Sequence, residues 1–258
     1  MGIAPVQRFA ASYREHPADH EHGLVIVHKG PSDSPIALEC RVIAQALDAD
    51  YLTVAPIGRD LDTYRQVAER VCADALCLLN TSSEILAGGW LSALHEALCR
   101  PATGLVGATG SFESAFSSAP RPLRPFLRRR FAPFPNPHIR TNAFMLRREL
   151  MLDLRWGHGR GKRGVLALES GHNSITRQIQ ERGLRAVVVG RDRRAYESDE
   201  WRRSATFRSG GQANLLIADN RTRQYADASP TLRAELEAFA WGPATAITSA
   251  PRAPAHRA

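Results

Sequence analysis

Residues 75–84 read Ala-Leu-Cys-Leu-Leu-Asn-Thr-Ser-Ser-Glu. The first half is an apolar run about as long as one strand, and the second half is small, polar and acidic. A continuous apolar run is typical of a strand that is covered on both faces of its sheet. In open α/β folds, ligands bind at the carboxyl ends of such strands. The stretch therefore predicts a buried strand that delivers Asn80, Ser82 and Glu84 to a candidate site.

Similar apolar runs recur along the chain and alternate with helical patterns. We expect strands at 23–28, 51–55, 75–79, 104–108, 140–146 and 184–189, and helices at 6–15, 35–47, 62–71, 86–99, 148–154, 174–182, 213–217 and 232–239. This alternation predicts an α/β fold with a mostly parallel, doubly wound sheet flanked by helices. We expect one domain over 1–241, containing a long flexible loop at 109–137, and a disordered tail at 242–258.

Arginine supplies nearly all of the positive charge. The formal net charge is +8, and Lys29 and Lys162 are the only lysines. A basic balance suits an anionic substrate, an anionic membrane surface or nucleic acid. We do not expect nucleic acid, because no recognised binding module is present and most aromatic residues are not interleaved with arginines. The loop segment 121–131 does mix arginine with phenylalanine, which leaves open peripheral membrane contact, contact with an acceptor, or a mobile solvated loop.

The cysteines and the apolar runs bear on the compartment. Cysteines 40, 72, 77 and 99 show no C-x-x-C spacing, which favours reduced thiols over disulfides or zinc. No apolar run is long enough to span a bilayer, and the first residues lack a signal-peptide core. We expect a cytoplasmic protein, with the inner face of the membrane as a candidate place of peripheral attachment.

Several motifs follow the 75–84 stretch in a fixed order. They are Gly-Trp-Leu at 89–91, Thr-Asn-Ala-Phe-Met-Leu-Arg-Arg-Glu at 141–149, Leu-Glu-Ser-Gly at 168–171, Thr-Arg at 176–177 and Arg-Gly-Leu-Arg-Ala-Val-Val-Val-Gly at 182–190. Over roughly residues 23–190 this order resembles family 2 glycosyltransferases with the GT-A fold. The resemblance implies a nucleotide-diphosphate sugar as donor and a glycan or a lipid-linked molecule as acceptor.

The family's metal motif, Leu-Asn-x-Asp-x-Asp/Glu, is only partly kept here. Asn80 and Glu84 match it, whereas Ser82 stands where the resemblance implies an aspartate. A hard divalent cation such as Mn²⁺ or Mg²⁺ prefers carboxylate and phosphate oxygens, so the missing carboxylate weakens metal binding. Either Glu84 and the substrate hold the metal, or arginines neutralise the diphosphate instead. The candidate arginines are Arg59, Arg140 and Arg208.

Glu169 matches the first carboxylate of the family's acceptor motif, and Ser170 replaces the second. Inverting transfer needs a base for the acceptor hydroxyl, and the resemblance implies that Glu169 is this base. Two alternatives stay open: Glu169 only caps the following helix, or His172 serves in its place. We expect Glu169 and Glu84 to face each other across one cleft.

The remaining candidates are contacts to the donor or the acceptor. Asp60 and Asp62 match nucleotide-contacting positions of the family, with helix capping as the alternative. Lys29 follows the first strand in a loop that a ligand could approach. The polar run 135–142 offers acceptor or diphosphate contacts at His138, Arg140 and Asn142. A C-terminal polar segment, 207–220, is either a lid over the donor or a surface turn, and it contains Arg208 and Gln212.

The resemblance to family 2 glycosyltransferases therefore implies an inverting glycosyltransferase, of the kind used in polysaccharide biosynthesis. A degenerate, non-catalytic GT-A domain that binds nucleotide or glycan, or scaffolds a partner, is the main alternative, and Ser82 and Ser170 support it. A nucleotidyltransferase is the second alternative. It would need a glycine-rich, lysine-containing phosphate loop, which residues 28–31 match poorly.

Overall fold

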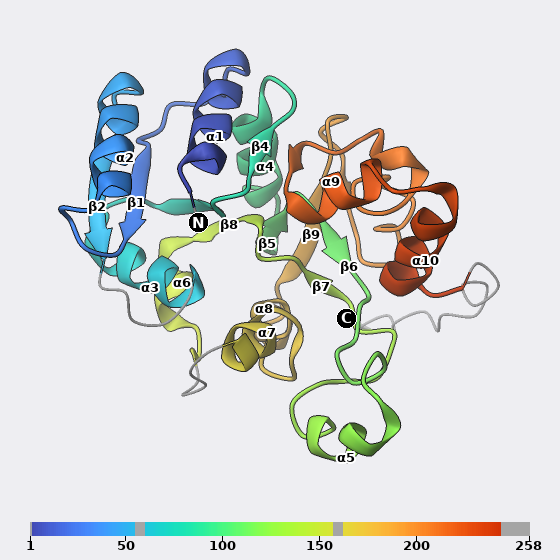
Figure 1. The fold of residues 1–258 in the computed structure, drawn as a ribbon. Coiled ribbons are helices and arrows are strands. Elements are labelled where there is room, and N and C mark those ends of the chain that lie inside the picture. Colours follow the sequence, from blue (N-terminus) through green and yellow to red (C-terminus); the bar gives the residue numbers. More distant parts are fainter. Residues whose placement is uncertain (1, 55–59, 157–161, 244–258) are drawn as a thin grey trace.

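The computed structural model describes residues 2–54, 60–156 and 162–243, without the side chains of 60–62, 162 and 163. Figure 1 shows a central sheet with helices packed around it. The helices are α1 (Ala4–Glu15), α2 (Pro35–Ala46), α3 (Asp60–Arg70), α4 (Trp90–Leu98), η1 (Arg121–Leu123), α5 (Arg124–Leu127), α6 (Arg148–Asp153), α7 (Lys162–Ser170), α8 (Ile175–Glu181), η2 (Gly210–Gln212), α9 (Asn220–Ala226) and α10 (Pro230–Trp241). In the described part of the chain, no helix combines the length and the apolar character that crossing a membrane requires.

The strands form one large sheet and three small ones. The strands are β1 (Val25–Lys29), β2 (Asp50–Val54), β3 (Ala75–Leu79), β4 (Glu84–Ile85), β5 (Thr103–Gly107), β6 (Gly110–Ser111), β7 (His138–Ile139), β8 (Ala143–Arg147), β9 (Arg185–Val189), β10 (Ala195–Tyr196) and β11 (Ile217–Ala218). The central sheet has five strands in the order β10-β9-β5-β8-β3, and the pairs β1-β2, β11-β4 and β6-β7 stand apart from it. The predicted α/β class, with a central sheet between helices, is confirmed.

The pairing of the central sheet is more mixed than the sequence predicted. β5 and β9 are parallel, as are β1 and β2, but β8 runs antiparallel to both of its neighbours, β3 and β5. β10 is a short antiparallel edge strand beside β9. Helices cover both faces of the sheet, so β8 is a continuous apolar run like a buried parallel strand. Such a run does not indicate whether the strand is parallel or antiparallel to its neighbours.

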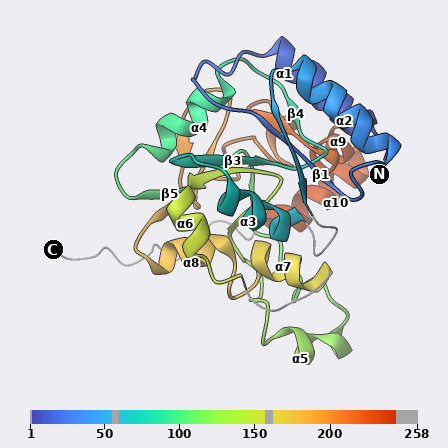
Figure 2. The ribbon, with the colours of Figure 1, turned by 90° about the vertical axis from the view of Figure 1, so that its left-hand side faces the viewer.

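Both faces of the central sheet are buried, which explains the continuous apolar runs. Alternate residues of β8 enter different cores: Phe144 and Leu146 pack on one face, and Ala143 and Met145 on the other. The helices α1, α2 and α4 share the second face, while α3, α6 and α8 share the first (Figure 2). Gly107 is required for this packing, because a Cβ there would meet Ile139 Cγ2 at 2.4 Å.

The C-terminal segment returns to the end of β3. We expected a helix near 213–217, but residues 217–218 form β11, which pairs with β4 in antiparallel fashion. The helix expected from residue 86 begins only at Trp90, since Glu84 and Ile85 belong to β4. A capping box then starts α9: the Asp219 side chain accepts from the Thr222 backbone N–H, and the Thr222 hydroxyl accepts from Asp219 N–H.

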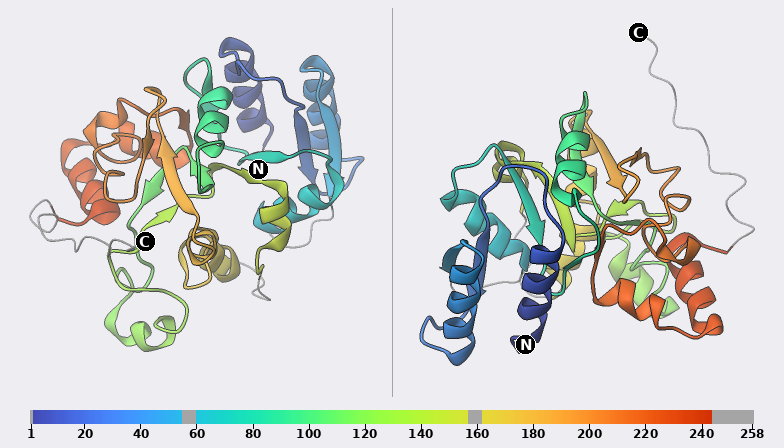
Figure 3. Two further views of the ribbon diagram at one scale, coloured as in Figure 1. Left: turned by 180° about the vertical axis from the view of Figure 1, so that it is seen from behind. Right: turned by 90° about the horizontal axis from the view of Figure 1, so that it is seen from above.

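Two further segments differ from the sequence prediction. Residues 109–137 contain β6, η1 and α5, and form a protrusion with α5 at its far end (Figures 1 and 3). Glu169 lies in the last turn of α7, a helix that the sequence did not predict, rather than at a loop before a helix. The glycines near residue 160 made this segment look like a loop in the sequence. The second half of α7, Val-Leu-Ala-Leu-Glu, nevertheless consists mostly of good helix formers. Most of the predicted tail, 244–258, lies outside the described residues.

Candidate active site

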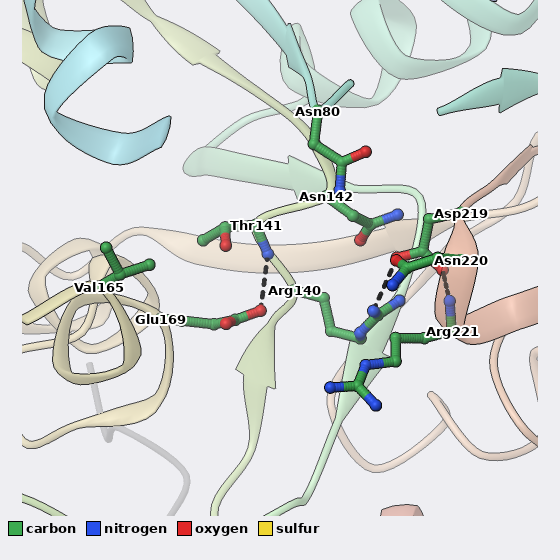
Figure 4. A pocket seen from close by; sticks show the side chains of 9 residues that line it. All are labelled: Asn80, Arg140, Thr141, Asn142, Val165, Glu169, Asp219, Asn220 and Arg221. Atoms are coloured by element: carbon green, nitrogen blue, oxygen red, sulfur yellow. Dashed lines mark hydrogen bonds and ion pairs between the residues drawn. The ribbon is translucent and has the colours of Figure 1, made fainter. Parts of the chain in front are cut away.

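A polar cavity of about 200 Å³ opens where the ends of three elements meet. These are the carboxyl end of β3, the amino end of β8 and the start of α9, with α7 on the opposite side (Figure 4). The cavity is lined by Asn80, Arg140, Thr141, Asn142, Val165, Glu169, Asp219, Asn220 and Arg221. Four of them, Asn80, Arg140, Asn142 and Glu169, are residues that the sequence singled out, and Asn80 lies at the carboxyl end of β3.

Glu169 presents a half-buried carboxylate to this cavity. Its Oε1 accepts a hydrogen bond of 3.1 Å from the Thr141 backbone N–H, which orients the group toward the start of β8 (Figure 4). No hydrogen bond to Oε2 occurs among the described residues, so that oxygen is available to a ligand. The geometry gives Glu169 a fixed position with one acceptor atom to spare.

A buried ion pair forms the opposite wall. Arg140 Nη2 lies 2.7 Å from Asp219 Oδ2, and the two side chains are 9% and 1% exposed. Burial on its own raises the pKa of Asp219, but the charge of Arg140 and hydrogen bonds from Thr222, Arg140 and Arg221 hold it below the usual range. For Arg140, burial alone lowers the pKa, and the charges of Asp219 and Glu169 outweigh it. Both groups are therefore charged at neutral pH.

Asn142 brings an unused donor to the cavity. The Thr109 hydroxyl accepts from Arg140 Nη1 and donates to Asn142 Oδ1 over 2.8 Å, which fixes the amide orientation. Asn142 is 4% exposed, and its Nδ2 has no hydrogen-bond partner in the described part of the protein. A buried amide without an acceptor costs free energy unless a bound group supplies one. This atom therefore indicates a ligand that offers oxygen acceptors.

Asn80 shapes the strand end. Its Oδ1 accepts from the Ser82 backbone N–H at 2.9 Å and from the Ser83 hydroxyl at 3.2 Å, which makes an Asx turn after β3. Its backbone N–H donates to Asn142 O over 2.8 Å. Asn80 thus holds the ends of β3 and β8 together beside the cavity.

Glu84 does not lie where the sequence led us to expect it. Its Oε2 accepts from Arg223 Nη1 at 2.9 Å and lies 4.0 Å from Arg8 Nε, and Glu84 does not line the cavity. The prediction that Glu84 and Glu169 face each other across one cleft is wrong. The cause is the β4–β11 pairing, which brings Arg223 of α9 onto this carboxylate.

A resident divalent metal does not fit this strand end. The charge of Glu84 is neutralised by Arg223, the same arginine bonds Ser82 O at 3.0 Å, and Ser82 has no carboxylate to offer. Within residues 2–54, 60–156 and 162–243, no group of three or more His, Cys, Asp or Glu side chains could hold a metal ion. The donor set lacks the oxygen anions that Mn²⁺ or Mg²⁺ requires, and we derive no chemical step through a metal.

Several other predicted residues do not line the cavity. Lys29 ends β1 and His138 is buried in β7, where its Nδ1 contacts Asn136 O at 2.9 Å. Arg208 is buried in an ion pair of 2.7 Å with Glu113, and Gln212 bonds the backbone of residues 208 and 222. The contacts of His138, Arg208 and Gln212 are structural, and none of the four predicted residues lines the cavity.

The predicted nucleotide contacts cannot be placed. Asp60 and Asp62 belong to the first turn of α3, but their side chains lie outside the described part, as does all of Arg59.

The sequence predicts no individual role for Asp219, Asn220 or Arg221. It offers the segment ending at residue 220 as a lid or a surface turn, whereas residues 219–221 form one wall of the cavity. An Asp-Asn-Arg-Thr run after an apolar pair is a helix-capping signal, and a cap that also faces a site cannot be told from an ordinary one by sequence. Thr141 and Val165 carry no sequence signal of their own, because Thr141 contributes a backbone N–H and Val165 is an apolar residue of a helix.

The chain was compared with known families and structures. No family model matches it, and no curated protein matches it. One similar solved structure is "Mannosyltransferase PcManGT from Pyrobaculum calidifontis in complex with GDP-Man and Mn2+", with a TM-score of 0.48 and 16% sequence identity. The similarity covers 79% of this chain and 58% of that one, so the present chain spans little more than half the length of that protein.

Proposed function

We propose that this protein is a glycosyltransferase that uses the cavity beside Glu169 to transfer a sugar from a nucleotide-diphosphate donor to an acceptor hydroxyl. The observation that carries the proposal is the pairing of one oriented carboxylate with unused donors in a single cavity. The ordered motifs over residues 23–190, which resemble family 2 glycosyltransferases, supply the reaction class.

Glu169 acts as the general base in this proposal. The hydrogen bond from Thr141 fixes Oε1, and Oε2 takes the proton of the acceptor hydroxyl. The acceptor oxygen then bonds the anomeric carbon, and the bond from that carbon to the diphosphate oxygen breaks. Its electron pair leaves on the nucleoside diphosphate, and the configuration inverts.

Guanidinium groups neutralise the diphosphate. Arg221 is exposed at the cavity and forms no ion pair among the described residues, so it is available to phosphate oxygens. The buried Arg140 adds positive charge to the wall of the cavity, although Asp219 offsets part of that charge. Planar guanidinium groups suit phosphate oxygens well. Of the two, only Arg140 was among the arginines that the sequence suggested for this role.

The size of the cavity limits what it holds. A volume of about 200 Å³ is below the roughly 300–1,000 Å³ of pockets that enclose whole drug-sized ligands. We therefore assign the cavity to the sugar and the diphosphate. The base and ribose are assigned to the region of Lys29, Asp60 and Asp62, as the sequence proposed.

A non-catalytic binding domain is the second candidate, and a specific observation favours it. Glu84, the acidic residue that closes the family's metal motif, is occupied by Arg223, so the chain has lost the usual means of activating a diphosphate leaving group. Such a domain would keep the donor or glycan site without transfer.

The test is a thermal-shift screen of the full chain against UDP-, GDP-, dTDP- and CDP-sugars, with EDTA or with Mn²⁺. Saturating one of them at about 100 times its Kd should raise the Tm by roughly 5–10 °C, and equally so in EDTA. A flat response to every donor would contradict the proposal. A shift without any release of nucleoside diphosphate, measured on the same donor, would select the non-catalytic candidate.

A further inference from the structure

Within the protrusion, residues 112–131 form the arginine lobe, and backbone hydrogen bonds hold it against the body. Phe112 N–H donates to Ala240 O at 3.0 Å, and Phe131 bridges Gly171. His172 N–H donates to Arg130 O at 2.8 Å. Because Gly171 and His172 directly follow α7, the base of the lobe is joined to the helix that carries Glu169.

The lobe is strongly basic. Its exposed arginines, none of which forms an ion pair within the part of the chain that the structure describes, are Arg121, Arg128, Arg129 and Arg130. Between Glu113 and Glu149 the sequence contains no acidic residue at all. Exposed arginines that form no ion pair leave a local positive potential, which an external anion would neutralise.

Large apolar side chains stand among these arginines. Phe126 is 79% exposed, the highest value of any large apolar residue in the described chain, and Leu123 is 52% exposed. They lie on α5 and η1, at the tip that projects away from the sheet in Figures 1 and 3. A rigid apolar tip surrounded by cationic groups is the arrangement by which proteins bind the interface of an anionic membrane.

We propose that the arginine lobe docks on the surface of an anionic lipid bilayer, with the arginines on the headgroups and Phe126 and Leu123 at the acyl boundary. Nucleic acid would use the arginines but not a convex, apolar tip, since nucleic-acid sites combine grooves with stacked aromatic rings. Resting on the proposed function, the docking assigns the acceptor to the lipid-linked class. Phe131 and Arg130 contact Gly171 and His172, two and three residues after Glu169, so the base and the membrane contact are directly linked.

The test is co-sedimentation of the full chain with vesicles of phosphatidylcholine alone or with added phosphatidylglycerol. The wild-type protein should bind the anionic vesicles, and this binding should weaken as the salt concentration rises. The triple variant Arg128→Ala, Arg129→Ala, Arg130→Ala should bind roughly 100-fold more weakly, at about fivefold per arginine. Phe126→Ala should lose roughly tenfold. These side chains are exposed, so Tm should not change.

A matched control removes the same charge elsewhere. Arg100, Arg147 and Arg203 are also exposed and form no ion pair in the described chain, and their triple alanine variant should bind vesicles within about threefold of wild type. Equal losses in both triple variants would mean a response to net charge and would overturn the proposal. Equal binding to neutral and anionic vesicles would also overturn the proposal. The same holds if RNA displaces the protein from anionic vesicles and the Phe126→Ala variant binds these vesicles as well as the wild type does.

A fluorescent variant gives a second readout. The four tryptophans of the chain, at 90, 156, 201 and 241, are buried, so Phe126→Trp adds a distinct exposed emitter. Its emission should shift to the blue with anionic vesicles and stay unchanged with neutral ones; no shift with either would contradict docking. Failure here with intact donor binding overturns only the lobe proposal, whereas vesicle binding without donor binding overturns only the proposed function.

Discussion

Arg223 donates a hydrogen bond of 2.9 Å to Glu84, a residue 139 positions earlier in the chain. A second hydrogen bond from the same guanidinium, to Ser82 O at 3.0 Å, fixes both groups on the turn after β3. Together with the β4–β11 pairing, this contact ties the C-terminal segment to the strand end. The wall formed by residues 219–221 therefore depends on a carboxylate that the sequence assigned to a metal.

Arg223→Ala should destabilise the protein. The ion pair is partly buried, with exposures of 28% and 30%, and one hydrogen-bonded carboxylate loses its partner, so we expect a loss of about 1–2 kcal/mol in urea unfolding. Arg8→Ala removes only the looser contact of 4.0 Å and should cost less than about 0.5 kcal/mol. Equal effects of the two variants would refute the anchoring role of Arg223.

Metal binding should appear only after the ion pair is removed. Wild-type protein should leave the electron paramagnetic resonance signal of micromolar Mn²⁺ unchanged, because Arg223 neutralises Glu84. The double variant Ser82→Asp, Arg223→Ala frees one carboxylate and adds a second, so it should bind Mn²⁺ measurably. Tight binding by the wild type that Glu84→Gln abolishes would contradict this account.

The Arg140–Asp219 pair predicts a pH dependence of stability. Because the folded pKa of Asp219 is depressed, its contribution is complete above the unfolded value of about 3.9 and is lost as the pH falls through the folded value. Asp219→Asn keeps a good helix cap but leaves Arg140 buried without its anion, which should cost about 3–5 kcal/mol at neutral pH. Urea unfolding between about pH 7 and pH 3 should show a smaller acid-induced loss in the variant than in wild type. Parallel curves would contradict the prediction.

Arg221→Ala should weaken donor binding without weakening the fold. The side chain is exposed at the cavity and bonds no described residue, so we expect Tm within about 2 °C of wild type. Charge-assisted hydrogen bonds to phosphate contribute about 1.5–3 kcal/mol, so the Kd for the nucleoside diphosphate should rise at least tenfold. Arg100→Ala is the matched control. Calorimetric titration showing equal Kd values for both variants would exclude Arg221 from the diphosphate site.

The sequence predicted the fold well wherever the pattern was local. The strand at 75–79 matches β3 residue for residue, and the helices at 35–47 and 174–182 agree with α2 and α8 to within about one residue. Ser34 and Ser174 are the N-caps of these two helices, and a capping serine is likewise a local sequence signal for the start of a helix. By contrast, the sequence could not show that β8 runs antiparallel, because strands buried on both faces read alike in either direction.

The site could be predicted only in part for a related reason. Four predicted residues do line the cavity: Asn80, Arg140, Asn142 and Glu169. Each lies in or next to a motif, and the order of these motifs along the chain could be read from the sequence. The contacts of Glu84 with Arg223 and of Arg140 with Asp219 join residues 139 and 79 positions apart. Both contacts form because the C-terminal segment packs beside the end of β3. Its position there is set by the two-residue pairing of β11 with β4, and such a short pairing has no periodic sequence pattern that could predict it.

The most direct test of the central claim is nucleoside diphosphate release by Glu169→Gln, measured with the donor that stabilises the wild-type protein. The side-chain amide oxygen of this variant can still accept the hydrogen bond from Thr141, but the amide cannot take a proton from the acceptor. We predict that release falls at least 100-fold while the donor Kd changes less than about threefold. Undiminished release, or loss of donor binding together with the fold, would contradict the role of Glu169 as the base.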